Sequence, residues 1–71
     1  MITTIFGTEV EIVGADQDDH GAIWLKVLIL RDGEKVKRVY LMSQLRADDG
    51  FSEIVEAIQA LPPKDRRGVE L

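Results

Sequence analysis

One Asp-Gly dipeptide constrains the fold of this chain more than any other feature of its sequence. Asp32 and Gly33 separate two mainly apolar runs, residues 22–31 (AIWLKVLILR) and residues 34–42 (EKVKRVYLM). A two-residue type I′ turn needs positive φ at both central positions, and Asp-Gly is among the pairs that accept it best. We therefore expect a tight β-hairpin. Counting outward from the turn pairs Arg31 with Glu34, Leu30 with Lys35, Leu28 with Lys37 and Lys26 with Val39.

Both faces of the predicted hairpin are largely apolar. Successive side chains of a strand point to opposite faces, so one face of the first strand holds Ile23, Leu25, Val27 and Ile29. The other face is a mixed aromatic, aliphatic and cationic surface formed by Trp24, Lys26, Leu28, Leu30, Lys35, Lys37, Val39 and Leu41. Either a second layer covers this mixed surface, or the surface lies at a subunit interface.

The segments before and directly after the hairpin predict short elements. Residues 2–6 are rich in β-branched side chains and predict a strand that Gly7 breaks. Residues 8–13 alternate, so that Val10 and Ile12 point inward from a second strand. Residues 43–45 predict a single helical turn.

An amphipathic helix is predicted near the C-terminal end. Asp49, Gly50 and Ser52 compete for its N-cap position. One apolar stripe with helical spacing runs through Phe51, Ile54, Val55, Ile58 and Leu61. Pro62 and Pro63 end the helix, because proline lacks the backbone N–H that a helix interior needs.

These elements predict a small α+β domain. We expect about four antiparallel strands in a strongly bent sheet, an SH3-like or OB-like barrel, followed by one C-terminal amphipathic helix. The alternative is a flat meander with the helix laid across it, in one version as a dimer. The domain is expected to span residues 1–63, and residues 64–71 (KDRRGVEL) to form a flexible polar tail.

The size of the chain limits the stability that its core can supply. A chain of 71 residues forms one domain at most. The core of such a domain supplies roughly 3–5 kcal/mol of net stability, and small domains usually add disulfides, a metal or a partner subunit. The sequence contains no cysteine, which excludes disulfides, thiolate zinc sites and cysteine nucleophiles. The remaining possible sources of stability are good packing, a bound hard cation and self-association.

Targeting signals are not evident. The start of the chain, MITTIFGTEVEIVG, has no basic segment, long apolar core or small-residue cleavage site, so no signal peptide is predicted. The longest apolar run, residues 27–30, is far shorter than the roughly 20 residues that cross a bilayer. We expect a cytoplasmic protein without a membrane partner.

An acidic loop over residues 14–21 (GADQDDHG) resembles the start of a calcium loop. Asp16, Asp18 and His20 fall at ligand positions 1, 3 and 5, and Gly21 falls at position 6. Position 12, however, is Val27 instead of a bidentate glutamate, and no helices flank the loop. We therefore expect a solvated loop and no cofactor, with weak cation binding by its aspartates as the alternative.

Catalysis is not predicted. The single histidine, His20, would have to serve any hydrolytic triad, and nothing links it to Ser43, the nearest serine. The glycine-rich motifs that cradle phosphate groups are absent, and no small-molecule substrate is evident.

The charge distribution leaves a nucleic-acid interface as one alternative. Thirteen acids and nine bases give a net charge of −4, which disfavours general phosphate binding. Residues 22–46, however, hold six of the bases and only two acids. Single-stranded nucleic acid is bound through stacking and phosphate contacts, and Trp24 could supply the stacking. The basic residues of this alternative site are Lys26, Lys35, Lys37, Arg38 and Arg46.

A contact surface for protein is the preferred interpretation. One helix of three turns covers only part of such an apolar hairpin, and exposed apolar patches mark interfaces. Tryptophan and tyrosine also dominate the energetics of many interfaces. We expect a non-catalytic interaction or accessory domain, self-associating or bound to another protein. Its site residues are expected to be Trp24, Leu28, Leu30 and Tyr40, with Lys37 and Arg38 at the rim.

Overall fold

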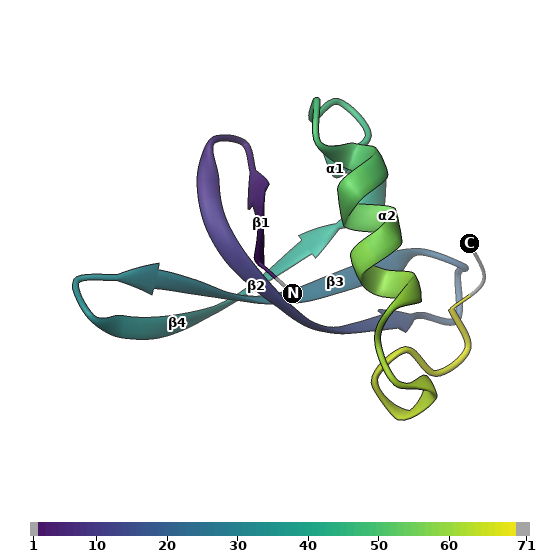
Figure 1. The fold of residues 1–71 in the computed structure, drawn as a ribbon. Helices are drawn as coiled ribbons and strands as arrows, with labels where there is room; N and C mark the ends of the chain where they lie inside the picture. The colour runs from purple at the N-terminus through teal and green to yellow at the C-terminus, as the bar shows by residue number, and fades with distance from the viewer. Residues whose placement is uncertain (1, 70–71) are drawn as a thin grey trace.

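The computed structural model describes residues 2–69 and contains one antiparallel sheet with two α-helices packed on one face (Figure 1). Strands β1 (Ile2–Ile5), β2 (Thr8–Gln17), β3 (Ile23–Arg31) and β4 (Glu34–Leu41) lie side by side in chain order. Helix α1 (Met42–Leu45), helix α2 (Phe51–Gln59) and the 3₁₀ helix η1 (Pro63–Asp65) follow. The predicted α+β order is therefore confirmed. Across residues 2–69, no helix has the length and apolar character needed to cross a membrane.

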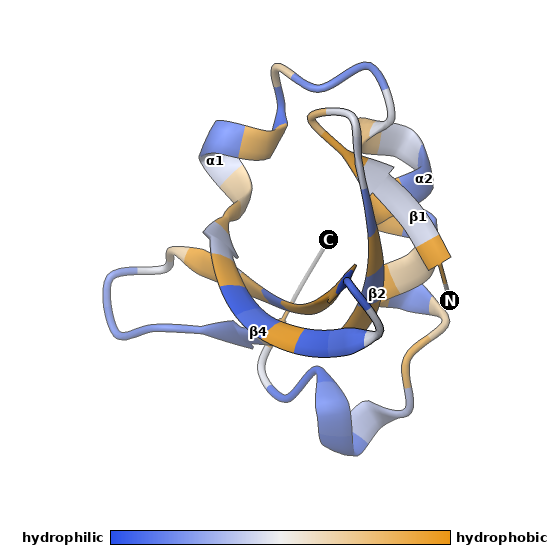
Figure 2. Ribbon diagram, turned by 90° about the vertical axis from the view of Figure 1, so that its left-hand side faces the viewer, coloured by the Kyte–Doolittle hydropathy of each residue, from blue (hydrophilic) through white to orange (hydrophobic). Residues whose placement is uncertain are grey.

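The β3–β4 hairpin forms as the Asp-Gly turn predicts. Asp32 has φ 51° and Gly33 has φ 79°, as a type I′ turn requires. All four pairs counted outward from the turn are present: Arg31 with Glu34, Leu30 with Lys35, Leu28 with Lys37 and Lys26 with Val39. Along β4, Val36 and Val39 each follow a pair of charged residues, so blue and orange segments succeed one another on this strand (Figure 2).

A second turn of the same kind joins β1 to β2. Phe6 has φ 48° and Gly7 has φ 81°, so Phe6 occupies a backbone region that large side chains rarely adopt. The Asp48 carboxylate supports this turn: its Oδ1 accepts a hydrogen bond from the Phe6 N–H at 3.1 Å. Its Oδ2 accepts one from the Gly50 N–H, also at 3.1 Å. Asp48 thus ties the β1–β2 turn to the start of α2.

The core lies between the sheet and the helices. Of the three candidates for the α2 N-cap, Gly50 occupies the position, and no side chain caps the helix. The amphipathic stripe of α2 buries Ile54 and Ile58 completely, while Phe51, Val55 and Leu61 are half-buried at its margin. The buried apolar residues are Ile5, Val10, Ile12, Ala15, Leu25, Val27, Met42, Leu45, Ile54, Ala57 and Ile58. The strand residues among them all lie on the face of the sheet that α1 and α2 cover.

A β-bulge bends β2. Ile12 pairs with Val27 and Gly14 pairs with Lys26, so Val13 is an extra residue without a partner. The sequence pattern indicated only that Gly14 ends or bulges a strand. The structure continues β2 through the bulge to Gln17, and the strand curves strongly (Figure 1).

The sheet is open, so the predicted closed barrel is not confirmed. Among residues 2–69, β1 and β4 are the two edges and do not pair with each other. The physical reason is the length of β1, whose four residues pair only with Thr8–Glu11 of β2. The remainder of β2 therefore has no strand on its β1 side, and helices instead of further strands complete the core.

The segment after α2 folds back onto the sheet. The Asp65 carbonyl oxygen lies beside the β2 bulge, 3.4 Å from where a Cβ on Gly14 would be. Arg66 Nε donates a hydrogen bond to the Leu61 carbonyl oxygen at 2.9 Å, and Val69 packs against the core. The flexibility expected for residues 64–71 stays a prediction, and residues 70–71 lie outside the described residues.

Candidate protein-interaction surface

The face of the sheet opposite α1 and α2 is called here the outer face. Strand alternation and the observed register place on it Glu9, Glu11, Val13 and Asp16 of β2, Trp24, Lys26, Leu28 and Leu30 of β3, and Lys35, Lys37, Val39 and Leu41 of β4. Among residues 2–69, α1 and α2 pack on the other face of the sheet, and η1 borders the outer face beside Gly14. The mixed surface predicted from the sequence therefore exists, and β2 extends it with acidic residues.

Large apolar side chains are exposed on the outer face. The exposed fraction is 38% for Trp24, 47% for Leu30 and 57% for Val39, whereas Leu25 on the opposite face of β3 is 0% exposed. Val13, Lys26, Lys37 and Val39 contribute to the lining of an open hollow of about 350 Å³. Hydrophobic burial stabilises by about 25 cal/mol per Å² of apolar surface, so covering these side chains would be favourable.

The acidic loop holds Trp24 in place. The Trp24 indole Nε1–H donates a hydrogen bond to Asp18 Oδ2 at 3.1 Å. Asp18 Oδ1 accepts two more, from the backbone N–H groups of His20 and Ala22, each at 2.9 Å. The bond from Trp24 is the largest cause that lowers the pKa of Asp18 below its usual 3.8. Asp18 therefore organises the turn between β2 and β3 and orients an exposed aromatic ring.

The same bonds give the aspartates of this loop a structural role. Both Asp18 oxygens accept N–H donors, and Asp16 Oδ2 lies 2.6 Å from Lys26 Nζ. Across residues 2–69, no group of three His, Asp or Glu side chains is arranged to hold a metal ion. Weak cation binding by these aspartates stays a prediction.

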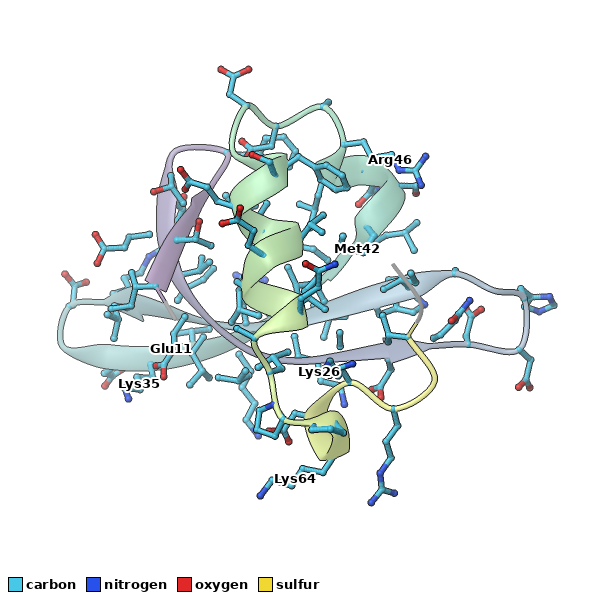
Figure 3. All side chains as sticks on the ribbon, turned by 45° about the vertical axis from the view of Figure 1, so that its right-hand side comes forward. Glu11, Lys26, Lys35, Met42, Arg46 and Lys64 are labelled. Atoms are coloured by element: carbon cyan, nitrogen blue, oxygen red, sulfur yellow. The ribbon has the colours of Figure 1, made fainter. Side chains whose placement is uncertain are left out.

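The charges of the outer face are arranged by strand. Its acids, Glu9, Glu11 and Asp16, all belong to β2, whereas Lys35 and Lys37 belong to β4. One ion pair connects the two sets across β3, with Lys35 Nζ 3.8 Å from Glu11 Oε2, and a second joins Lys26 of β3 to Asp16 of β2 (Figure 3). Within residues 2–69, Lys37 and Glu9 make no ion pair. The outer face thus has an acidic side, an apolar centre and a basic side.

The structure brings together four of the six residues predicted for the protein-interaction site. Trp24, Leu28, Leu30 and Lys37 share the outer face. Tyr40 pairs with Leu25 and Arg38 pairs with Val27, so both lie on the opposite face of the sheet. Tyr40 is half-buried against the core, and Arg38 is exposed beside it on the strand. The period of two along β4 separates them from the rest of the site.

The alternative basic site is divided among three places. Lys26, Lys35 and Lys37 lie on the outer face, Arg38 lies on the opposite face, and Arg46 follows α1. Figure 3 shows Arg46 far from Lys35. Two of the three lysines on the outer face are paired with carboxylates, which weakens their attraction for phosphate. Nothing in the arrangement favours nucleic acid over protein.

Sequence reasoning omitted several outer-face residues from the site. Val39 belongs to the predicted mixed surface but not to the predicted site residues, although it is the most exposed large apolar residue of β4. Glu11, Val13 and Asp16 were not included, because their position depends on how β2 pairs with β3 around the bulge. The sequence signal for the face that the β2 side chains occupy is the alternation over residues 9–12, and this alternation stops at Val13.

The comparisons with known proteins return no family. No protein-family model matches this chain, and neither does any curated protein or solved structure.

Proposed function

We propose that this protein is a non-catalytic interaction module that binds protein through the outer face of its sheet. The observation that carries the proposal is the exposure of Trp24, Leu30 and Val39 on the sheet face opposite α1 and α2. Aromatic and aliphatic anchors at the centre of a patch, with charged residues around them, are typical of protein interfaces.

The positioning of Trp24 supports the same proposal. A tryptophan that only filled the core would be buried, but Trp24 is 38% exposed and its indole N–H is bonded to Asp18. The ring is therefore held in a defined orientation before any partner binds. Such preorganisation lowers the entropy cost of binding, because fewer rotamers are lost. The cytoplasmic location and the likeness to SH3-like or OB-like barrels stay predictions, and the proposal depends on neither.

Two matched variants test the proposal. Leu30 and Val36 are 47% and 38% exposed and belong to the same hairpin, but Leu30 lies on the outer face and Val36 on the opposite one. Leu30→Lys and Val36→Lys therefore make similar chemical changes on the two faces. The immobilised wild-type chain and both variants are used to capture proteins from cells of the source organism, and the amount of each captured protein is measured.

The expected result is loss of capture with Leu30→Lys and retention with Val36→Lys. Because both positions are exposed, circular dichroism is expected to show the same folded structure for all three chains. Capture that survives Leu30→Lys but is lost with Val36→Lys would place the interface on the opposite face and overturn the proposal.

A further inference from the structure

We propose that the outer face binds a second copy of this chain, with a two-fold axis parallel to β3 and lying between the two sheets. This inference rests on the proposed function, since it names the partner of the same surface. The observation that carries it is the order of charges on the outer face, with acids on β2 and lysines on β4.

The outer face is complementary to itself about this axis. A two-fold interface uses the same patch on both copies. Rotation about an axis parallel to β3 brings β2 of one copy opposite β4 of the other. The acidic side, with Glu9 and Glu11, then faces the basic side, with Lys35 and Lys37, at both margins of the contact.

The rows of the sheet set the expected contacts. Glu11, Leu28 and Lys37 form one row across β2, β3 and β4. A rotation about β3 keeps this row in register, so that Glu11 faces Lys37 of the second copy and Leu28 faces Leu28. Lys37 makes no ion pair within residues 2–69, and Glu11 of the second copy, whose Oε2 lies 3.8 Å from Lys35 of its own chain, would then contact both lysines.

The centre of the contact is apolar. Leu28 and Leu30 lie on β3, nearest to the axis, and each would pack against the same residue of the second copy. Lys26 also lies on β3, but its ammonium is 2.6 Å from Asp16 of its own chain, which offsets the repulsion between the two copies. Because η1 borders the face beside Gly14, the contact is centred on the Leu28 and Leu30 end.

Two other symmetric arrangements are disfavoured by charge. An axis across the strands would place β2 over β2 and β4 over β4, so acids would face acids and lysines would face lysines. Pairing of the free β4 edges would bring Lys35, Lys37 and Arg38 of both copies together. Like charges directly opposite are destabilising in a sheet, and charged edge strands usually prevent such pairing.

Sedimentation equilibrium over a range of concentrations tests the inference. The wild-type chain is expected to form a dimer. Lys37→Glu introduces two like-charge contacts per dimer with Glu11, and about tenfold weaker association is expected, since 1.4 kcal/mol corresponds to a factor of ten. Arg38→Glu is the matched control, because it makes the same change one residue along β4 on the opposite face. It is expected to leave the dimer unchanged.

Charge exchange tests the direction of the axis. Glu11→Lys alone is expected to weaken the dimer, and the double variant Glu11→Lys with Lys37→Glu is expected to restore association to near the wild-type level. Weakening by Lys37→Glu without rescue by the double variant would overturn the proposed axis. A dimer that is insensitive to Leu30→Lys would overturn the use of this face.

A strict monomer at millimolar concentration would overturn the inference and leave the proposed function open to its own test. In that outcome, capture that depends on Leu30 but not on Val36 shows that the outer face binds a different protein. Failure of both tests removes the proposed function as well.

Discussion

The indole N–H of Trp24 donates a hydrogen bond to the carboxylate of Asp18, six residues earlier in the chain, at 3.1 Å. This bond joins the acidic loop to the outer face of the sheet. It explains why a carboxylate stands in the turn between β2 and β3, and it makes the single tryptophan a reporter of that turn.

The fluorescence of Trp24 is expected to change as Asp18 is protonated. The pKa of Asp18 in the folded chain is lowered from 3.8, mainly by the bond from Trp24. A carboxyl group whose pKa is lowered by folding stabilises the fold fully at a pH above its unfolded-state pKa. This contribution is lost as the pH falls through the folded-state pKa. Emission measured from pH 6 downward should therefore show a midpoint below 3.8.

Two variants separate this transition from general acid unfolding. Asp18→Asn is expected to remove the midpoint, because the amide does not titrate. Asp19→Asn, at the exposed neighbouring position, is expected to keep it. If all three chains share one midpoint, the emission reports unfolding and the assignment to Asp18 is wrong.

Asp48→Ala is expected to destabilise the fold by about 1–3 kcal/mol. The substitution removes the acceptor for two backbone N–H groups, that of Phe6 in an exposed turn and that of Gly50 in a half-buried place. Urea denaturation measures the loss. Asp49→Ala is the control and is expected to cost about 0.5 kcal/mol or less, since the Asp49 side chain is exposed. Equal losses for both variants would contradict the role of Asp48.

Phe6→Asn is expected to stabilise the chain by about 0.5–1 kcal/mol. Phe6 has φ 48°, where asparagine is tolerated better than a bulky residue, and the residue is 56% exposed. Thermal unfolding gives the measurement. Asp32→Asn is the comparison at the other turn of this type, where little change is expected because aspartate already suits the position. A loss above about 1 kcal/mol for Phe6→Asn would show that the ring packs more than its exposure indicates.

Leu25→Ala is expected to cost about 2–5 kcal/mol, which approaches the whole stability of a domain of this size. Leu25 is 0% exposed on the inner face of β3. Leu30→Ala on the outer face should cost under about 0.5 kcal/mol in the monomer, as for other exposed positions. Urea denaturation at a concentration where the chain is monomeric measures the free energy of unfolding of both variants. Similar costs would mean that the outer face is also covered within one chain.

Labelled single-stranded DNA is expected not to bind at low salt. Non-specific phosphate binding typically has a Kd of about 10⁻⁴–10⁻⁶ M, and it tightens as salt is removed. Lys26 and Lys35 are paired with Asp16 and Glu11, so their attraction for phosphate is reduced. Fluorescence anisotropy at two salt concentrations checks this. Salt-dependent binding that Lys37→Glu abolishes would favour the nucleic-acid alternative.

The sequence by itself determined the β3–β4 hairpin, its register and the buried stripe of α2. The reason is local: a two-residue turn leaves one way to count outward from Asp32 and Gly33, and the periods of two and 3.6 residues separate inward from outward positions. The same counting places Trp24, Leu28, Leu30 and Lys37 on one face of the hairpin, as the structure has them.

Only the tertiary structure decided which of the two apolar faces of β3 the helices cover. Both faces satisfy the same alternation, and the choice depends on where α1 and α2 pack in space. The bulge at Val13, the open sheet and the bonds of Asp18 and Asp48 likewise depend on contacts between segments that a local pattern does not relate. Local periods specify faces and pairs, whereas long-range packing specifies which face remains available for a partner.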